Sequence, residues 1–230
     1  MTPGPVDWTR IRLAVFDVDG TLYDQRELRR RMLLDLARNT ITSRSLETAK
    51  VLYQFRRLRE AIAEEELDGF QATLMERTAQ KAGVGASSVR NLVSEWIDQR
   101  PLVHIRRCRY PDVEKVFAAL RLRGKTIGIF SDYPAASKLH ALELSADLIV
   151  SATDSTMDVL KPAPRGLIRL MAAAGVTPAE TIMIGDRAER DGEAALRAGV
   201  ACLLRSDRPL SGWACFSTYR DACFLPLLTA

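Results

Sequence analysis

The sequence predicts an α/β fold, in which a parallel β-sheet carries helices on both faces and a long all-helical segment follows the first strand. From residue 111 onward, short apolar strands alternate with amphipathic helices, which is typical of a parallel sheet. Between residues 25 and 104, apolar residues recur at helical spacing, and no segment has the pattern of a strand. A chain of 230 residues, 47% of them hydrophobic, is long enough for a core domain and a second, smaller domain.

The elements of the sheet can be assigned in order. The first strand is expected at residues 11–16, where apolar side chains predominate. The later strands are expected at residues 126–130, 147–151, 181–186 and 200–204. Helices are expected at residues 113–123, 164–175 and 191–199, and around Leu139 and Leu142. The tail after Arg205 gives no clear pattern, and its aromatic residues Trp213, Phe216 and Tyr219 are expected to pack on the core.

The segment between the first two strands is expected to be a helical bundle. One apolar stripe with helical spacing consists of Val51, Phe55, Leu58 and Ile62. The charged residues expected on the opposite face of that helix are Arg56, Arg57, Arg59 and Glu60. These patterns divide the chain into a core domain of residues 1–24 and 105–230 and a helical domain of residues 25–104.

Composition excludes several classes of protein. The net charge is only +4, and the basic residues are scattered, so a nucleic-acid partner is not expected. No apolar run is long enough to cross a membrane, and the N-terminus lacks the apolar core of a secretory signal. The four cysteines form neither a CxxC pair nor a zinc-binding pattern, which favours reduced thiols. We therefore expect a cytoplasmic protein.

Polar residues follow several of the predicted strands. These residues are Asp17 and Asp19, Ser131 and Asp132, Asp186 and Asp191, with Lys161-Pro162 in a turn between the later strands. Each alone is an ordinary turn former or helix cap. Because the carboxyl ends of parallel strands meet at one edge of the sheet, together they predict a shared site. Repelling carboxylates need a cation, and oxygen ligands with few histidines or cysteines favour Mg²⁺.

These motifs resemble, in combination and in order, those of the haloacid dehalogenase (HAD) superfamily. FDVDGTL is similar to the first family motif, DxDxT, and Ser131 matches the second motif. Lys161-Pro162 matches the third motif, and GDRAERD matches the fourth in its GDxxxxD form. The resemblance spans nearly the whole chain. It implies a Rossmann-like core, a helical cap domain of type 1, and membership of the phosphatase-like subfamily.

The resemblance also implies roles for individual residues. Asp17 would attack the phosphoryl group and form an aspartyl-phosphate, while Asp19 would be the general acid and base. Lys161 would be catalytic too, because it offsets the growing negative charge. The residues implied to bind phosphate are Gly20, Thr21, Ser131, Asp132 and Lys161. The residues implied to hold Mg²⁺ are Asp17, Asp19 through its carbonyl, Asp186, and Asp191 through water.

The expected activity is Mg²⁺-dependent hydrolysis of a small phosphorylated metabolite. Haloacid dehalogenases lack an aspartate at the position of Asp19, so its presence disfavours dehalogenation. A sugar phosphomutase and a non-catalytic binding protein of the same fold remain as alternatives. Phosphosugars, phosphoglycolate-like acids and nucleotides stay open as substrates, and the sequence does not predict the oligomeric state. Candidate substrate contacts are Arg26, Arg29, Arg30, Tyr53, Arg56, Arg57, Tyr133 and Arg187. The alternative for the residues of the helical segment is a solvated face of the bundle, and for Tyr133 it is packing under the cap. For Arg187, the alternatives are an ion pair with Asp191 and an ordinary surface position.

Overall fold

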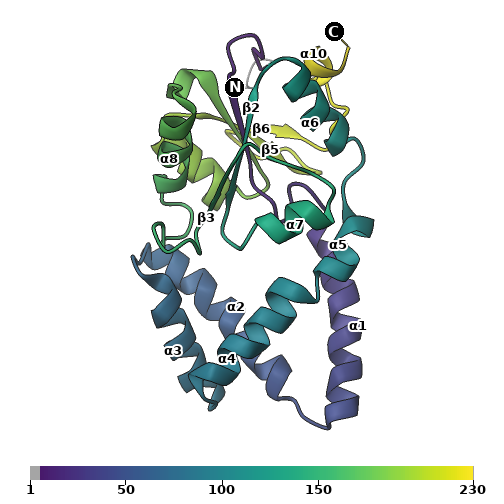
Figure 1. Cartoon of the computed structure of the whole chain (residues 1–230), viewed down its shortest axis with the longest axis vertical. Coiled ribbons are helices and arrows are strands. Elements are labelled where there is room, and N and C mark those ends of the chain that lie inside the picture. The colour runs from purple at the N-terminus through teal and green to yellow at the C-terminus, as the bar shows by residue number, and fades with distance from the viewer. Residues whose placement is uncertain (1–5, 230) are drawn as a thin grey trace.

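The computed structural model describes residues 6–229 and has an α/β body joined to a helical one (Figure 1). The first five residues, which belong to the stretch considered above for a secretory signal, lie outside the described residues. The α/β body holds both ends of the described chain, and the helical body projects from the edge of the sheet near α7 (Ala136–Ala141). The predicted α/β fold with inserted helices is confirmed.

The sheet has six strands, all parallel, in the order β3-β2-β1-β4-β5-β6. The strands are β1 Leu13–Phe16, β2 Thr126–Ser131, β3 Leu148–Ser151, β4 Thr181–Gly185, β5 Ala201–Arg205 and β6 Ala214–Phe216. The sequence predicted five of them. It missed β6, a three-residue strand in the tail, because so short a segment carries no alternating pattern.

Successive side chains of β1 enter two different cores. Leu13 and Val15 pack on the face covered by α8 (Arg165–Ala174) and α9 (Glu193–Arg197). Ala14 and Phe16 face the opposite core, which includes residues of α6 (Val113–Leu122). All four β1 residues are fully buried. A strand covered on both faces must be apolar throughout, which explains the continuous run that precedes Asp17.

The remaining short elements lie around the sheet. They are the 3₁₀ turn Pro178–Glu180 before β4, the π-helical turn η3 at Ala188–Gly192 before α9, and α10 at Leu225–Leu228. The tail aromatics Phe216 and Tyr219 are buried, and Trp213 is half-buried with its ring against Gly192. The expectation that the tail packs on the core is therefore confirmed.

The segment from residue 25 to residue 108 consists of helices joined by short turns, as predicted. This helical insertion consists of α1 Gln25–Ser43, α2 Glu47–Glu65, α3 Phe70–Ala82, α4 Ala86–Val93, the π-helix η1 Ser94–Gln99 and α5 Leu102–Cys108. Asp24 caps α1, since its carboxylate accepts the backbone N–H groups of Arg26 and Glu27. Because α5 runs through residues 104 and 105, the position of the domain boundary stays a prediction.

One prediction for α2 is wrong. Arg59 was expected on the face opposite the apolar stripe, yet only 5% of it is exposed. It lies on the buried stripe between Phe55 and Ile62, at spacings of four and three residues. Its guanidinium stacks over the Tyr133 ring, 4.0 Å from the ring centroid, and donates to the backbone carbonyl of Asp132. These contacts replace the water that the guanidinium loses, so the charge can be buried.

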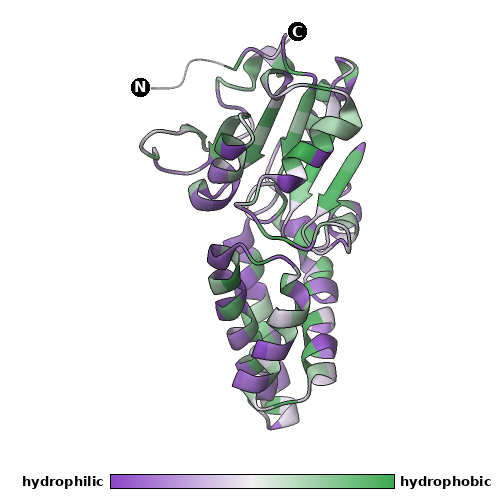
Figure 2. Ribbon diagram, turned by 90° about the vertical axis from the view of Figure 1, so that its left-hand side faces the viewer, coloured by the Kyte–Doolittle hydropathy of each residue, from purple (hydrophilic) through white to green (hydrophobic). Residues whose placement is uncertain are grey.

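Hydropathy follows this division of the molecule (Figure 2). The strands are the hydrophobic centre of the α/β body, and the helices of the insertion carry both hydrophobic and hydrophilic residues. Among residues 6–229, no helix combines the length and the apolar character needed to cross a membrane.

Candidate active site

The candidate site lies at the carboxyl edge of the sheet, where β1 is flanked by β2 and β4. Phe16 is paired in register with Ile129 of β2 and Ile184 of β4. Directly after Phe16, the backbone N–H of Asp17 donates to the carbonyl of Ile184 over 2.9 Å. The residues that follow the three strands therefore emerge side by side, and the structure brings the predicted site residues together at this edge.

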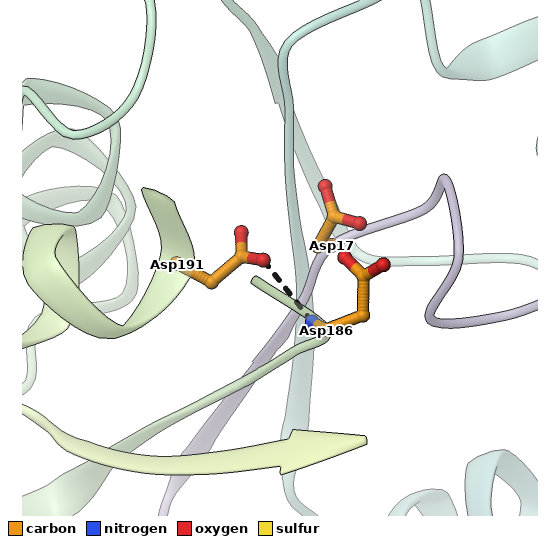
Figure 3. Close-up of side chains that lie close together, drawn as sticks. All are labelled: Asp17, Asp186 and Asp191. Carbon is orange, nitrogen blue, oxygen red and sulfur yellow. Dashed lines mark hydrogen bonds between the residues drawn. The ribbon is translucent and has the colours of Figure 1, made fainter. Parts of the chain in front are cut away.

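Three carboxylates form a cluster at this edge. Asp17, Asp186 and Asp191 each offer an oxygen atom, and these oxygens lie within 4.8 Å of one another (Figure 3). The second carboxylate oxygen of Asp191 accepts the backbone N–H groups of Asp186, at 3.1 Å, and Arg187, at 3.0 Å, which fixes its orientation. The turn that follows Asp17 and Asp19 requires glycine at position 20. Gly20 has a φ of 93°, and a Cβ there would lie 2.1 Å from an oxygen of Asp186.

The buried ammonium group of Lys161 links two of these carboxylates. Its Nζ lies 2.6 Å from Oδ1 of Asp17 and 2.6 Å from Oδ1 of Asp191, and it also donates to the carbonyl of Phe130. Burial alone would lower the pKa of Lys161, but the charges of Asp17 and Asp191 outweigh it and raise the pKa well above its usual range. Lys161 is therefore a fixed positive charge within the cluster.

The cluster nevertheless has more negative charge than this lysine offsets. Burial, followed by the charges of Asp191 and Asp19, raises the pKa of Asp17 to about 7 despite Lys161. Burial and the charges of Asp17 and Asp191 raise the pKa of Asp186 to about 8. These shifts show that full ionisation is costly without another cation. The donor set of three carboxylates is one that fits a hard divalent ion such as Mg²⁺.

The side chain of Asp19 is held separately from this cluster. Lys138 Nζ lies 2.6 and 2.7 Å from its two carboxylate oxygens, and the Tyr23 hydroxyl donates to one of them. Burial would raise the pKa of Asp19, but the charge and hydrogen bonds of Lys138, with the Tyr23 hydrogen bond, lower it overall. Asp19 is therefore a stabilised carboxylate beside the cluster.

The sequence analysis missed Lys138, although a signal was present. Ala135, Leu139 and Leu142 are buried at helical spacing, and Lys138 falls on the same stripe. A lysine on a buried stripe needs a partner of opposite charge, which here is Asp19. Neither Tyr23 nor Lys138 belonged to the predicted site.

The other predicted phosphate-binding residues also lie at this edge. The Thr21 hydroxyl donates to Asp17 Oδ2 over 3.2 Å, and the Ser131 hydroxyl accepts the backbone N–H of Tyr133 over 3.2 Å. Asp132 has a positioning contact instead, since its Oδ1 accepts the backbone N–H of Lys161 over 3.0 Å. These residues lie in or beside a cavity of about 920 Å³, the acidic cavity, which Asp17, Asp186 and Asp191 line.

Helix α2 of the insertion contacts this edge through Glu60. Its carboxylate pairs with Arg187 over two hydrogen bonds of 3.0 Å and with Arg190 over 3.0 Å. Arg190 is buried and also donates to the backbone carbonyl of Lys161 over 2.9 Å. The guanidinium of Arg187 thus pairs with Glu60 and Glu189, and only its backbone N–H contacts Asp191. The sequence did not predict this connection.

A second cavity, of about 640 Å³, lies among α1, α2 and η1 and is called the insertion cavity below. The candidate substrate contacts divide between the two cavities. Arg26 lines the acidic cavity, while Arg29 and Tyr133 line both. The residues that line only the insertion cavity are Tyr53, Arg56 and Arg57. Arg30 lines neither cavity. A guanidinium nitrogen of Arg30 lies 3.8 Å from a carboxylate oxygen of Glu27.

Known proteins resemble this chain in sequence and in fold. Phosphoglycolate phosphatase of Pseudomonas putida is 26% identical over 200 residues, which cover 84% of this chain and 68% of that protein. The magnesium-bound HAD-hydrolase YfnB of Bacillus subtilis superposes with a TM-score of 0.68 at 14% identity, covering 96% of this chain and 100% of that one. For 2-haloacid dehalogenase of Pseudomonas syringae, the TM-score is 0.65 at 17% identity, with 94% and 96% covered. The family model of haloacid dehalogenase-like hydrolases matches residues 11–199, and the chain therefore belongs to this hydrolase family.

Proposed function

We propose that the protein is a Mg²⁺-dependent phosphatase that hydrolyses a small phosphomonoester through an aspartyl-phosphate on Asp17. The observation that carries this proposal is the different surroundings of two neighbouring carboxylates. Asp17 lies in the carboxylate cluster beside Lys161, whereas Asp19 is held separately by Lys138 and Tyr23. Separate partners allow the two carboxylates to have different roles. Because the pKa of Asp17 is raised and that of Asp19 is lowered, the proposed roles require a bound cation to ionise Asp17 and the approach of the substrate to raise the pKa of Asp19.

The residues proposed to hold Mg²⁺ are Asp17 and Asp186 directly, Asp191 through water, and Asp19 through its backbone carbonyl. The carboxylate cluster and the raised pKa values of Asp17 and Asp186 support a cation here. When bound, the ion would reduce the repulsion between the nucleophilic carboxylate and the phosphate.

In the proposed reaction, an oxygen of Asp17 forms a bond to phosphorus while the bond from phosphorus to the leaving oxygen breaks. Asp19 in its protonated form gives a proton to that oxygen, and the resulting carboxylate then takes a proton from the attacking water. Water restores Asp17 and releases inorganic phosphate. Thr21, Ser131 and the backbone after Gly20 are proposed to hold the phosphoryl oxygens, and Lys161 to offset their charge. Asp132 assists by positioning the Lys161 loop.

The relatives support this assignment. The curated relative from Pseudomonas putida is a phosphoglycolate phosphatase, which acts on the kind of small phosphorylated acid considered above. The presence of Asp19 disfavours dehalogenation, which needs no proton donor for a leaving alcohol. We further propose that residues 25–104 are a cap domain on a core of residues 1–24 and 105–230, and that the partner is a small phosphorylated metabolite enclosed between them.

Substitution of the proposed nucleophile tests the function. Asp17→Asn should reduce phosphate release from a panel of phosphorylated metabolites by about a thousandfold or more, because the amide cannot form the covalent intermediate. The matched control is Asp68→Asn, which alters an exposed carboxylate whose partner is Arg165. EDTA should abolish the wild-type activity, and added Mg²⁺ should restore it.

Three results would contradict the proposal. The first is wild-type activity in Asp17→Asn, and the second is activity that EDTA leaves unchanged. The third is interconversion of phosphosugar isomers with little release of phosphate, which would identify a phosphomutase.

A further inference from the structure

The insertion cavity adjoins the acidic cavity at the proposed proton donor. The residues that line both cavities are Asp19, Gln25, Arg29, Glu60 and Tyr133. If Asp19 protonates the leaving oxygen, the alcohol part of the substrate must lie on the Asp19 side of the phosphoryl group. The space next to Asp19 on the side of α1 and α2 is the insertion cavity. This step rests on the proposed function, because it takes Asp19 as the acid.

The walls of the insertion cavity are mostly apolar and already formed. Its apolar lining includes Leu28, Met32, Leu36, Leu52, Trp96 and Ile97. All of these except Leu36 are buried, so their positions are set by packing. A cavity of about 640 Å³ is large enough for a drug-sized ligand, whereas a two-carbon acid would leave most of it unfilled. Each methylene group buried there should improve binding about fourfold.

Two arginines at this cavity have no acidic partner. Within residues 6–229, neither Arg29 nor Arg56 forms an ion pair, whereas Arg77 in α3 pairs with Glu65. The groups whose charges act on Arg56 are Tyr133 and Arg29, and neither is a carboxylate.

Arg29 lines both cavities, so its charge lies where they meet, whereas Arg56 lines the insertion cavity alone. The carboxylate of Glu60 also lies at this junction, but it is already paired with Arg187 and Arg190. A negative group on the carbon next to the ester oxygen would complement the charges of Arg29 and Arg56.

We propose that the insertion cavity is the leaving-group subsite, and that the substrate is a 2-phosphonooxy acid with an apolar side chain. Its carboxylate would contact Arg29 and Arg56, and its hydrocarbon chain would fill the space between α1, α2 and η1. Glycolate phosphate is the smallest member of this class and has no chain to bury.

A chain-length series tests the proposal. The substrates are 2-phosphonooxy acids from glycolate phosphate to the octanoic acid, with heptyl phosphate as the compound that lacks the carboxylate. kcat/KM should rise about fourfold per added methylene over the first members. Arg56→Gln should reduce kcat/KM for the octanoic compound about tenfold, toward the value for heptyl phosphate, whereas Arg90→Gln, at an exposed arginine of α4, should not.

Filling the cavity is the second measurement. Ala49 of α2 lines the insertion cavity, so Ala49→Trp should remove the increase in kcat/KM with chain length. Ala61→Trp, at an exposed position of the same helix, should leave that increase unchanged. The inference would be overturned if 4-nitrophenyl phosphate is hydrolysed but kcat/KM for glycolate phosphate equals or exceeds that for the longer acids. Failure to hydrolyse any of these compounds, 4-nitrophenyl phosphate included, would instead contradict the proposed phosphatase function.

Discussion

Asp17 and Asp19 lie two residues apart after the same apolar strand, yet their surroundings shift their pKa values in opposite directions. Burial and the charges of Asp191 and Asp19 raise that of Asp17, while Lys138 and Tyr23 lower that of Asp19. The motif in the sequence contains both carboxylates but not these partners. Lys138 is 119 residues from Asp19 along the chain, and only the fold brings the two together. The sequence therefore singled out these two carboxylates as candidates, and the structure shows the groups that set their charge.

Replacement of Lys138 should change the pH dependence of catalysis. Lys138→Met removes the positive charge beside Asp19, so the pKa of Asp19 should rise. The limb of the pH–rate profile that Asp19 controls should therefore move to higher pH. Lys138→Arg keeps the charge and should restore most of the wild-type profile. A lower rate with an unmoved profile in Lys138→Met would show that the residue has only a structural role.

At the scale of elements, periodicity predicted the helices of the insertion and most of the strands, but not every buried face. The spacing along α2 fits an apolar stripe through either Leu58 or Arg59, and the prediction chose Leu58. The structure buries Arg59, because Tyr133 and the carbonyl of Asp132 satisfy its guanidinium. Such contacts lie between elements far apart in sequence, so no local pattern could reveal them. Arg59 and Glu60 thus make α2 the helix that joins the insertion to the site.

The ion pairs of Glu60 should stabilise the contact between α2 and the site. Glu60→Gln weakens the pairing with Arg187 and leaves the buried Arg190 without its carboxylate. The conformation in which α2 contacts the site should become less populated. If substrate binds to that conformation, KM should rise about threefold to tenfold. Steady-state kinetics on the best substrate measure this effect, with Glu64→Gln as the control at an exposed position of the same helix. An unchanged KM in Glu60→Gln would show that these pairs do not affect substrate binding.

At the scale of the whole molecule, the alternation of strands and helices was enough to predict that the candidate site residues gather at one edge of the sheet. In a parallel sheet, all strands end at one edge, so residues that follow β1, β2 and β4 had to meet once those strands were neighbours. The strand order, the cavity volumes and the unpaired arginines could not be predicted in this way. They depend on how the insertion packs against the edge, which a single sequence does not encode in any local pattern.

The carboxylate cluster has a consequence for the stability of the whole molecule. Aspartate carboxyls ordinarily titrate near 3.8, whereas the pKa values of Asp17 and Asp186 in the folded protein are about 7 and about 8. At pH values between 3.8 and the raised pKa values, the folded state binds more protons than the unfolded state. The free energy of unfolding must therefore fall as pH rises through this range. Without a divalent ion, the contribution of these groups should therefore decline from about pH 4 to about pH 8.

Thermal unfolding in EDTA and in Mg²⁺ tests this expectation. The Tm in EDTA should fall between pH 5 and pH 8, and the increase in Tm on adding Mg²⁺ should be larger at pH 8, because the ion binds carboxylates that are then ionised. Asp186→Asn removes one carboxylate from the cluster, so its Tm in EDTA should depend less on pH, and Mg²⁺ should raise it less. The difference between wild type and variant isolates the cluster from other titrating groups. An equal Mg²⁺ effect at both pH values, or in both proteins, would show that Asp186 does not hold the ion.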